Sequence, residues 1–228
     1  MLGPMTSPRA LSLQAFFTLL LIALMMASNH IAARLAFNSG MDVATGVATR
    51  SLVTASLVAL LVVLARVPWR FNRQQGRGLL LVGLMIGVQS QCLYAAVARL
   101  PVALALLAFN TYPLWTALWD KLIYKRTPQR SVLLAMPLIL LGLAIALDVL
   151  GAASGLGAQA QWASIGEGVG FALAAACSCG WALVCTQHET AGMDGRVRTL
   201  FSLLLAGSVA LAVIGLQGGP HWPQTALG

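Results

Sequence analysis

Residues 105–126, "ALLAFNTYPLWTALWDKLIYKR", form an apolar run with polar groups at its centre and cations at its end. An amide and a hydroxyl, Asn110 and Thr111, stand beside the helix breaker Pro113. Proline removes a backbone hydrogen bond and bends a helix that continues through it. The stretch therefore predicts a membrane helix that is kinked near its middle and ends at a membrane surface, where Lys121 and its neighbouring cations begin.

The composition extends this interpretation to the whole chain. Of the 228 residues, 59% are hydrophobic and only 9% are charged, and the mean hydropathy is +0.83. A soluble domain carries about 25% charged residues. We therefore expect an integral membrane protein whose main solvent is the lipid bilayer. The net charge of +8 is not interleaved with aromatic residues as in a nucleic-acid groove, so no nucleic-acid partner is expected.

Seven apolar runs are long enough to be membrane-spanning helices. A bilayer core is about 30 Å thick and needs about 20 apolar residues per helix. The runs are continuous apolar blocks, unlike the alternating segments of a β-barrel. The predicted fold class is an all-α polytopic helical bundle with spans at 13–36, 43–65, 78–98, 101–120, 131–148, 165–187 and 198–217.

The basic residues between these runs predict the orientation of the chain. With the N-terminus in the cytoplasm, 11 cations fall inside and 3 outside, as the positive-inside rule favours. The cation-free segment 151–164 is interpreted as an outer loop. We expect a multi-pass protein of the inner (plasma) membrane. The inner cations are Arg9, Arg66, Arg70, Arg73, Arg77, Lys121, Lys125, Arg126, Arg130, Arg196 and Arg198, and the outer ones are Arg34, Arg50 and Arg99.

The chain also contains a weak internal similarity. Gly40-Met41-Asp42 matches Gly192-Met193-Asp194, and in both places an arginine and an apolar helix follow. The two segments begin predicted spans 2 and 7, which are five helices apart. A five-helix unit repeated once is necessarily inverted, and inverted repeats are the architecture of many secondary transporters. We therefore predict a complete first repeat at 1–150, an outer loop at 151–164 and a partial second repeat at 165–228.

Several of these stretches resemble the EamA-type members of the drug/metabolite transporter superfamily. The matching residues are Ser28-Asn29-His30, Arg50, Arg99-Leu100-Pro101, the span 103–123, and the Glu167–His188 helix with Gly180-Trp181. The resemblance implies ten helices in two five-helix repeats and alternating-access transport of small organic metabolites or drug-like compounds, usually export. The sequence departs from the pattern after span 4, where "YKRTPQR" contains no acid. It also contains seven spans, so spans 8 to 10 are expected to be missing and the second repeat truncated.

Polar residues within the apolar runs are the candidates for a substrate pathway. A central arginine costs about 2.5 to 3.5 kcal/mol to insert, so it usually faces a bundle interior or a water-filled cavity. The same residue types also join helices by hydrogen bonds, and Arg50 would alternatively extend to the outer interface. The candidates for the pathway are Asn29, Arg50, Gln89, Gln91, Asn110, Thr111 and Trp181.

Two of these positions have a more specific interpretation. Arg50 would hold an anionic group of the substrate. Pro113 would free backbone carbonyls near Asn110, which is tolerated at membrane depth where the backbone lines a cavity or is buried in protein. A kink that serves packing alone is the alternative for Pro113.

No constellation in the sequence supports catalysis. The histidines His30, His188 and His221 are far apart, and metal-ligand or nucleophile spacing is absent, so we expect no enzyme activity, cofactor or metal. The alternative to a transporter is a non-transporting membrane assembly or regulatory subunit derived from a truncated transporter. The expected partners are a small-molecule substrate and the bilayer, and the oligomeric state is left open, with a homo-oligomer among the options.

Overall fold

The computed structural model describes residues 12–69, 71–126, 130–148 and 158–223, and within these ranges every regular element is a helix. The predicted all-α membrane fold is therefore confirmed. The helices are α1 (Leu13–Asn38), α2 (Val43–Leu64), α3 (Arg73–Arg99), α4 (Val102–Phe109), α5 (Tyr112–Tyr124), α6 (Arg130–Ala146), α7 (Ala158–Glu189) and α8 (Gly195–Leu216).

Six of the seven predicted spans are long and apolar enough to cross a bilayer, counting α4 and α5 together as one. The predicted fifth span corresponds to α6, which has 17 residues with Pro137 inside it. At about 1.5 Å per residue α6 is about 25 Å long, shorter than a typical bilayer core of about 30 Å. The described helices thus make a multi-pass membrane protein with six candidate spans and one shorter apolar helix.

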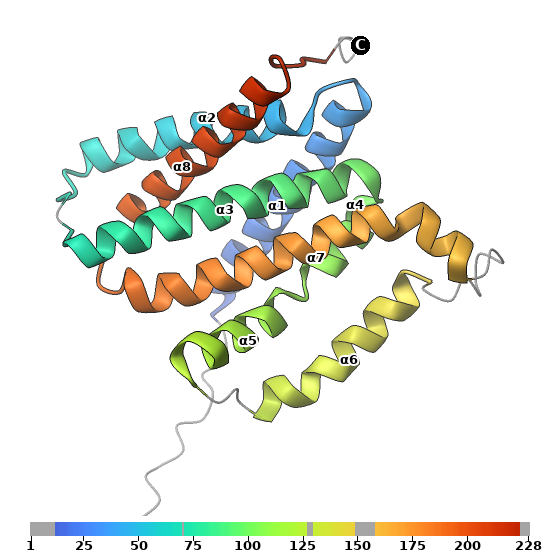
Figure 1. Ribbon diagram of the computed structural model, residues 1–228. Coiled ribbons are helices and arrows are strands. Elements are labelled where there is room, and N and C mark those ends of the chain that lie inside the picture. The colour runs from blue at the N-terminus through green and yellow to red at the C-terminus, as the bar shows by residue number, and fades with distance from the viewer. Residues whose placement is uncertain (1–11, 70, 127–129, 149–157, 224–228) are drawn as a thin grey trace, which may run out of the picture.

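The helices form a layer in which α3 is central. In Figure 1 α2, α8, α3 and α7 lie side by side, and α5 and α6 extend the layer beyond α7. The contacts of α3 with α7 and α8 are made through small residues. An ideal Cβ at Gly83 would lie 2.4 Å from Leu205 Cδ1, and one at Gly78 would lie 2.6 Å from Glu189 Cβ. Such close approach is the usual source of helix association in membranes, where no hydrophobic effect drives it.

The kink predicted within residues 105–126 is a complete break in the structure, where two helices are joined by a turn. α4 ends at Phe109, and the hydroxyl of Thr111 donates to the Ala108 carbonyl at 2.8 Å. Pro113 then lies in the first turn of α5, where its missing N–H needs no partner. The proline therefore begins a new helix after the interruption, which is more than the kink of a continuous helix.

The two Gly-Met-Asp segments have the same local structure. Gly40 and Gly192 take positive φ angles of 97° and 76°, a region that favours glycine. Asp42 and Asp194 then cap the next helix, accepting backbone N–H bonds from Thr45 at 3.0 Å and Arg196 at 2.8 Å. Each segment is thus a tight turn that leads directly into a membrane helix.

Asp42 also binds the segment that follows α8. Its Oδ1 accepts the His221 backbone N–H at 3.0 Å. Burial alone would raise the pKa of Asp42, but the hydrogen bonds from Thr45 and the His221 backbone outweigh burial and hold this pKa below its ordinary value. The carboxylate form of Asp42 is therefore the one that stabilises the fold.

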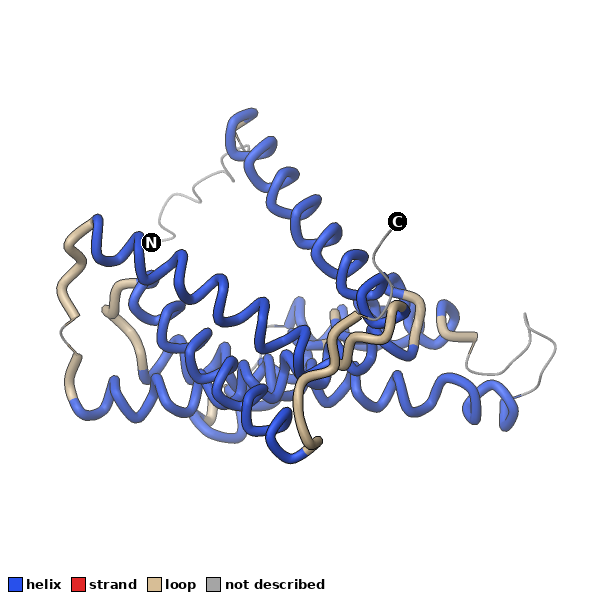
Figure 2. The backbone as a smooth tube through the Cα atoms, turned by 90° about the horizontal axis from the view of Figure 1, so that it is seen from above, coloured by secondary structure: helices blue, strands red, loops and turns tan. Residues whose placement is uncertain are grey.

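The first half of α1 is largely exposed. In Figure 2 α1 rises steeply away from the other helices. Most of its first sixteen residues are exposed, and Phe17 and Met25 are 57% and 66% exposed. The C-terminal part is attached to α3 by an edge contact of the Phe37 and Tyr94 rings, with centroids 5.9 Å apart. The exposed apolar surface of α1 is suited to lipid.

Two further predictions, the outer loop and the count of cations, involve residues at or beyond the limits of the described ranges. α7 begins at Ala158, so the last part of the predicted outer loop 151–164 is helical. Residues 151–157 of that loop lie outside the described residues, as do Arg9 and Arg70 among the counted cations.

Candidate functional site

Arg50 lies inside the bundle, at the interface of α2 with α3. It is seven residues into α2, about 10 Å from the helix start. Its Nη2 donates to Ser90 Oγ at 3.3 Å, and its Cζ lies 5.0 Å from the centroid of the Tyr94 ring. Its Nε is buried and has no hydrogen-bond partner. Arg50 is thus held by a neutral hydroxyl and an aromatic face, in the range expected for a cation–π contact.

The second half of α1 supplies two more polar groups beside Arg50. Asn29 donates from Nδ2 to the Tyr94 hydroxyl at 2.7 Å. The neighbouring His30 is 8% exposed, its ring centroid lies 5.6 Å from that of Tyr94, and its Nδ1 has no partner. Arg34 fixes this part of α1 by donating to the Val97 carbonyl of α3. Asn29, His30 and Arg50 therefore meet around Tyr94.

Two adjoining cavities open from this polar group. The first, of about 230 Å³, lies between α1 and α2 and has mainly alanine and aromatic walls. The second, of about 310 Å³, is lined by Ile22, Met25, Met26, Asn29, His30 and Arg50. Asn29 and Arg50 line both cavities. We call this pair of cavities, with the polar residues that join them, the Arg50 site.

The sequence predicted part of the Arg50 site. The structure brings Asn29 and Arg50 together, because both line the two cavities. Gln89 and Gln91 are half-buried, and neither lines the two cavities. The Nε2 of Gln91 is buried without a partner. The residues that contact Arg50 are instead Ser90 and, one turn later, Tyr94, which sequence reasoning missed.

The remaining candidates lie elsewhere in the bundle. Asn110 is exposed at the turn between α4 and α5, and Thr111 is buried with its hydroxyl bonded locally. Trp181 contacts Trp119, with ring centroids 4.7 Å apart, between α7 and α5. The indole N–H of Trp119 donates to the Cys177 carbonyl at 3.1 Å. None of these residues lines the cavities of the Arg50 site.

A cluster of ionisable groups at the ends of α3, α5 and α7 was also missed. His188 Nε2 lies 3.1 Å from Asp120 Oδ1, and the Tyr124 hydroxyl donates to Glu189 Oε1 at 2.7 Å. Gln74 Nε2 donates to the other Glu189 oxygen at 3.2 Å, and the Tyr124 and His188 rings stack with centroids 3.8 Å apart. We call these five residues the end cluster. The only local signal was the i, i+4 spacing of Asp120 and Tyr124 on one helix face.

The end cluster and the Arg50 site occupy opposite ends of α3. Gln74 and Tyr94 are both on α3, so the two groups are separated by about 30 Å along its axis. In the described part of the chain, no group of three or more His, Cys, Asp or Glu side chains is placed to hold a metal ion.

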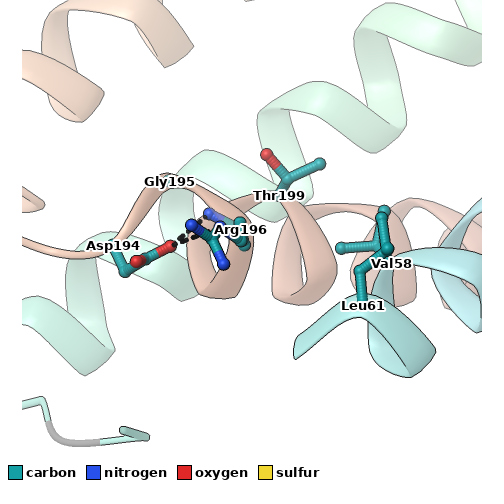
Figure 3. A pocket seen from close by; sticks show the side chains of 6 residues that line it. All are labelled: Val58, Leu61, Asp194, Gly195, Arg196 and Thr199. Atoms are coloured by element: carbon teal, nitrogen blue, oxygen red, sulfur yellow. Dashed lines mark hydrogen bonds and ion pairs between the residues drawn. The ribbon is translucent and has the colours of Figure 1, made fainter. Parts of the chain in front are cut away.

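A larger groove of about 490 Å³ lies where α2 meets the start of α8 (Figure 3). Asp194 and Arg196 line it together with apolar side chains of α2. Asp194 Oδ1 accepts the backbone N–H of Arg196 at 2.8 Å and lies 4.0 Å from its Nε. The arginine charge at this groove is therefore already balanced, unlike that of Arg50.

The fold and the polar cavities define a class of protein, a polytopic helical membrane protein with cavities lined in part by polar side chains. The chain belongs to the EamA-like transporter family, whose model matches residues 13–147. The match covers α1 to α6 and includes Asn29, Arg50 and Tyr94. A membrane transporter is implied by this membership, and members of the family are typically not enzymes. No match to an individual curated protein was found.

Proposed function

We propose that this chain forms the binding site and pathway of a transporter for small organic metabolites or drug-like compounds. The observation that supports this most directly is the Arg50 site. A guanidinium and an imidazole with unpartnered nitrogens stand beside two cavities in a chain of a transporter family. Polar groups inside a membrane protein are costly to leave unpaired, which is why they commonly mark a substrate pathway.

The positions of the Arg50 site and the end cluster support alternating access. The end cluster joins the ends of α3, α5 and α7 by three side-chain hydrogen bonds, so these three helices are held together at this end. The cavities lie about 30 Å away along α3, near the opposite end. Three helices that are joined beside one end of α3, with polar cavities beside its other end, match one half of an alternating-access cycle.

The direction we propose is export, with the N-terminus in the cytoplasm. The bias of 11 inner to 3 outer cations supports this orientation. The end cluster is then cytoplasmic and the Arg50 site lies in the outer half. The shared turn at Gly40 and Gly192 supports an inverted repeat whose second unit includes α7 and α8.

The orientation is tested with two single cysteines in a cysteine-free background. Asn38 is exposed at the end of α1, and Ala191 is exposed in the turn between α7 and α8, at the opposite end of the bundle. A membrane-impermeant thiol reagent should label Asn38→Cys in intact cells and Ala191→Cys only after permeabilisation. The reverse pattern would place the N-terminus outside.

The transport function is tested by comparing the solutes released by cells. Untargeted mass spectrometry of the medium should find at least one small organic solute enriched when the wild-type chain is expressed. Arg50→Gln should abolish the enrichment at equal membrane abundance, and Arg196→Gln, which changes the balanced arginine at the groove of Figure 3, should not. Unchanged media in all three strains would favour the non-transporting assembly or regulatory subunit.

A further inference from the structure

The charge of the Arg50 site is unbalanced. Among the residues that the structure describes, four pairs of oppositely charged or titratable groups lie within 4.0 Å, namely Arg99–Glu167, His188–Asp120, Arg196–Asp194 and His221–Asp42. Arg50 belongs to none of them. A cation inside a membrane protein that lacks a counterion is unfavourable by several kcal/mol, so the fold leaves a position where an anion would be stabilised.

The hydrogen-bonding capacity at this position is also largely unused. A guanidinium has five N–H donors in a planar fork that fits a carboxylate with two parallel bonds. One hydrogen bond from Arg50 is present, from Nη2 to Ser90. His30 Nδ1 adds a second unpartnered group, and both residues line the cavity of about 310 Å³. The unused donors and the unbalanced positive charge therefore both favour an anionic hydrogen-bond acceptor such as a carboxylate.

The rest of the Arg50 site is apolar. Met25 and Met26 line the larger cavity, and Phe37 and Met41 line the smaller one. The face of Tyr94 lies against the guanidinium, and its hydroxyl is occupied by Asn29. Small-molecule sites have volumes of about 300 to 1,000 Å³ and combine apolar walls with a few polar groups. The larger cavity falls at the lower end of that range.

We propose that the Arg50 site binds small organic monoanions in which a carboxylate is attached to an apolar body. Arg50 binds the carboxylate, His30 forms a further hydrogen bond to it, and the methionine-lined and aromatic walls contact the apolar body. Asn29 acts as a positioning residue by holding the Tyr94 hydroxyl. The proposal rests on the proposed transport function and names the substrate class for it. Organic cations are excluded by repulsion from Arg50.

The binding test uses three probes of nearly the same shape. Phenylacetate, phenylacetamide and phenethylamine present an anionic, a neutral and a cationic group on one apolar body. The purified full chain in nanodiscs of zwitterionic phosphatidylcholine is heated with each probe, and the unfolding temperature is followed by intrinsic fluorescence. Phenylacetate should raise it with a saturable dose dependence that weakens as salt is added. The other two probes should not.

Variants of Arg50 assign the effect to this residue. Arg50→Gln should weaken phenylacetate binding at least about tenfold, as expected when a charge-assisted hydrogen bond is lost. Arg50→Lys keeps the charge without the planar fork and should fall between wild type and Arg50→Gln, which makes the test independent of whether the glutamine variant folds poorly. Arg196→Gln is the matched control and should bind as wild type does.

Anionic lipid is the other source of the same chemistry, because α1 is exposed beside the larger cavity. Nanodiscs with phosphatidylglycerol test it directly. A stabilisation by phosphatidylglycerol that needs Arg50, with no response to phenylacetate in either lipid, would overturn the organic-anion site. Equal shifts with phenylacetate and phenethylamine, or unchanged binding in Arg50→Gln, would also overturn it. Binding in nanodiscs is measured independently of transport by cells. If phenylacetate binds but no solute is transported, the proposed transport function is refuted and the proposed anion site is retained.

Discussion

Replacing Gly180 by alanine should separate α7 from α5 and destabilise the bundle. An ideal Cβ at this position would lie 2.7 Å from Thr116 N, 2.8 Å from Trp115 Cβ and 2.9 Å from Trp115 C. No rotamer change relieves these contacts, because the atoms belong to the α5 backbone or are fixed to it. Reaching ordinary contact requires the helices to move apart by about 0.7 Å. A gap of this size removes about a quarter to a half of the attractive dispersion energy of each atom pair that it separates.

The free-energy cost follows from the contacts that this shift disturbs. Trp119 rests on Trp181 and donates its indole N–H to the Cys177 carbonyl, both across the α5–α7 interface. Overpacking of a tight interface costs about 1 to 3 kcal/mol. We therefore expect Gly180→Ala to lower the free energy of unfolding by about 1 to 3 kcal/mol, measured by denaturant titration in bicelles.

Gly170 provides the matched control on the same helix. An ideal Cβ there meets no atom within 4 Å, so Gly170→Ala should leave the free energy of unfolding unchanged or raise it slightly through better helix propensity. If the two variants unfold alike, the close contact between α7 and α5 does not contribute to stability. The reasoning from backbone proximity would then be wrong.

Three further outcomes are expected. Asp42→Ala should lower the free energy of unfolding by about 1 kcal/mol at pH 7 through loss of the helix cap. The loss should be smaller in thermal melts at pH 3, because the pKa of Asp42 is lowered in the folded protein and the stabilising carboxylate form is lost as pH falls through that pKa. Tyr124→Phe removes the hydrogen bond to Glu189 and should lower the free energy of unfolding by about 1 kcal/mol in the same assay. An unchanged free energy of unfolding would mean that water replaces the hydroxyl. In a cysteine-free background, Asn110→Cys should react with a charged thiol reagent and Leu107→Cys, one turn earlier on the apolar surface, should not. Failure of a correctly inserted Asn110→Cys to react would remove Asn110 from the pathway.

The sequence predicted those features that depend on single residues against an apolar background. The class of protein followed from the scarcity of charge, and the break between α4 and α5 followed from Pro113 beside two polar residues. Asn29 and Arg50 were chosen as candidates because a polar group within a membrane span is unusual whatever its neighbours, and the structure places them beside the same cavities. These inferences need no knowledge of how one helix is rotated against another.

The residues that contact Arg50 could not be predicted, because they depend on how α3 is rotated about its own axis relative to α2. Consecutive residues on a helix point about 100° apart, so Gln89 and Gln91 lie to either side of the face that carries Ser90. Ser90 and Tyr94 share that face at a spacing of four residues. An aromatic residue near a helix end gave no signal of its own, and Tyr94 was therefore overlooked.

The end cluster could not be predicted for a related reason. Asp120 and His188 are 68 residues apart, and each is unremarkable near the end of a membrane helix. They meet only because Gly180 lets α7 approach the backbone of α5 closely. The predicted fifth span, 131–148, was already short, and the structure ends this helix at Ala146.

The central place of α3 has a consequence for how the chain is made. Gly78 of α3 packs against Glu189 of α7. A ribosome adds about 5 to 20 residues per second, so α3 enters the bilayer about 5 to 20 s before the end of α7 exists. During this interval the glycine-bearing face of α3 lacks α7 and α8, and α3 can contact only the earlier helices, as in the contacts of Ser90 and Tyr94 with Arg50 and Asn29. The packing of this face of α3 is therefore completed only when α7 and α8 are synthesised.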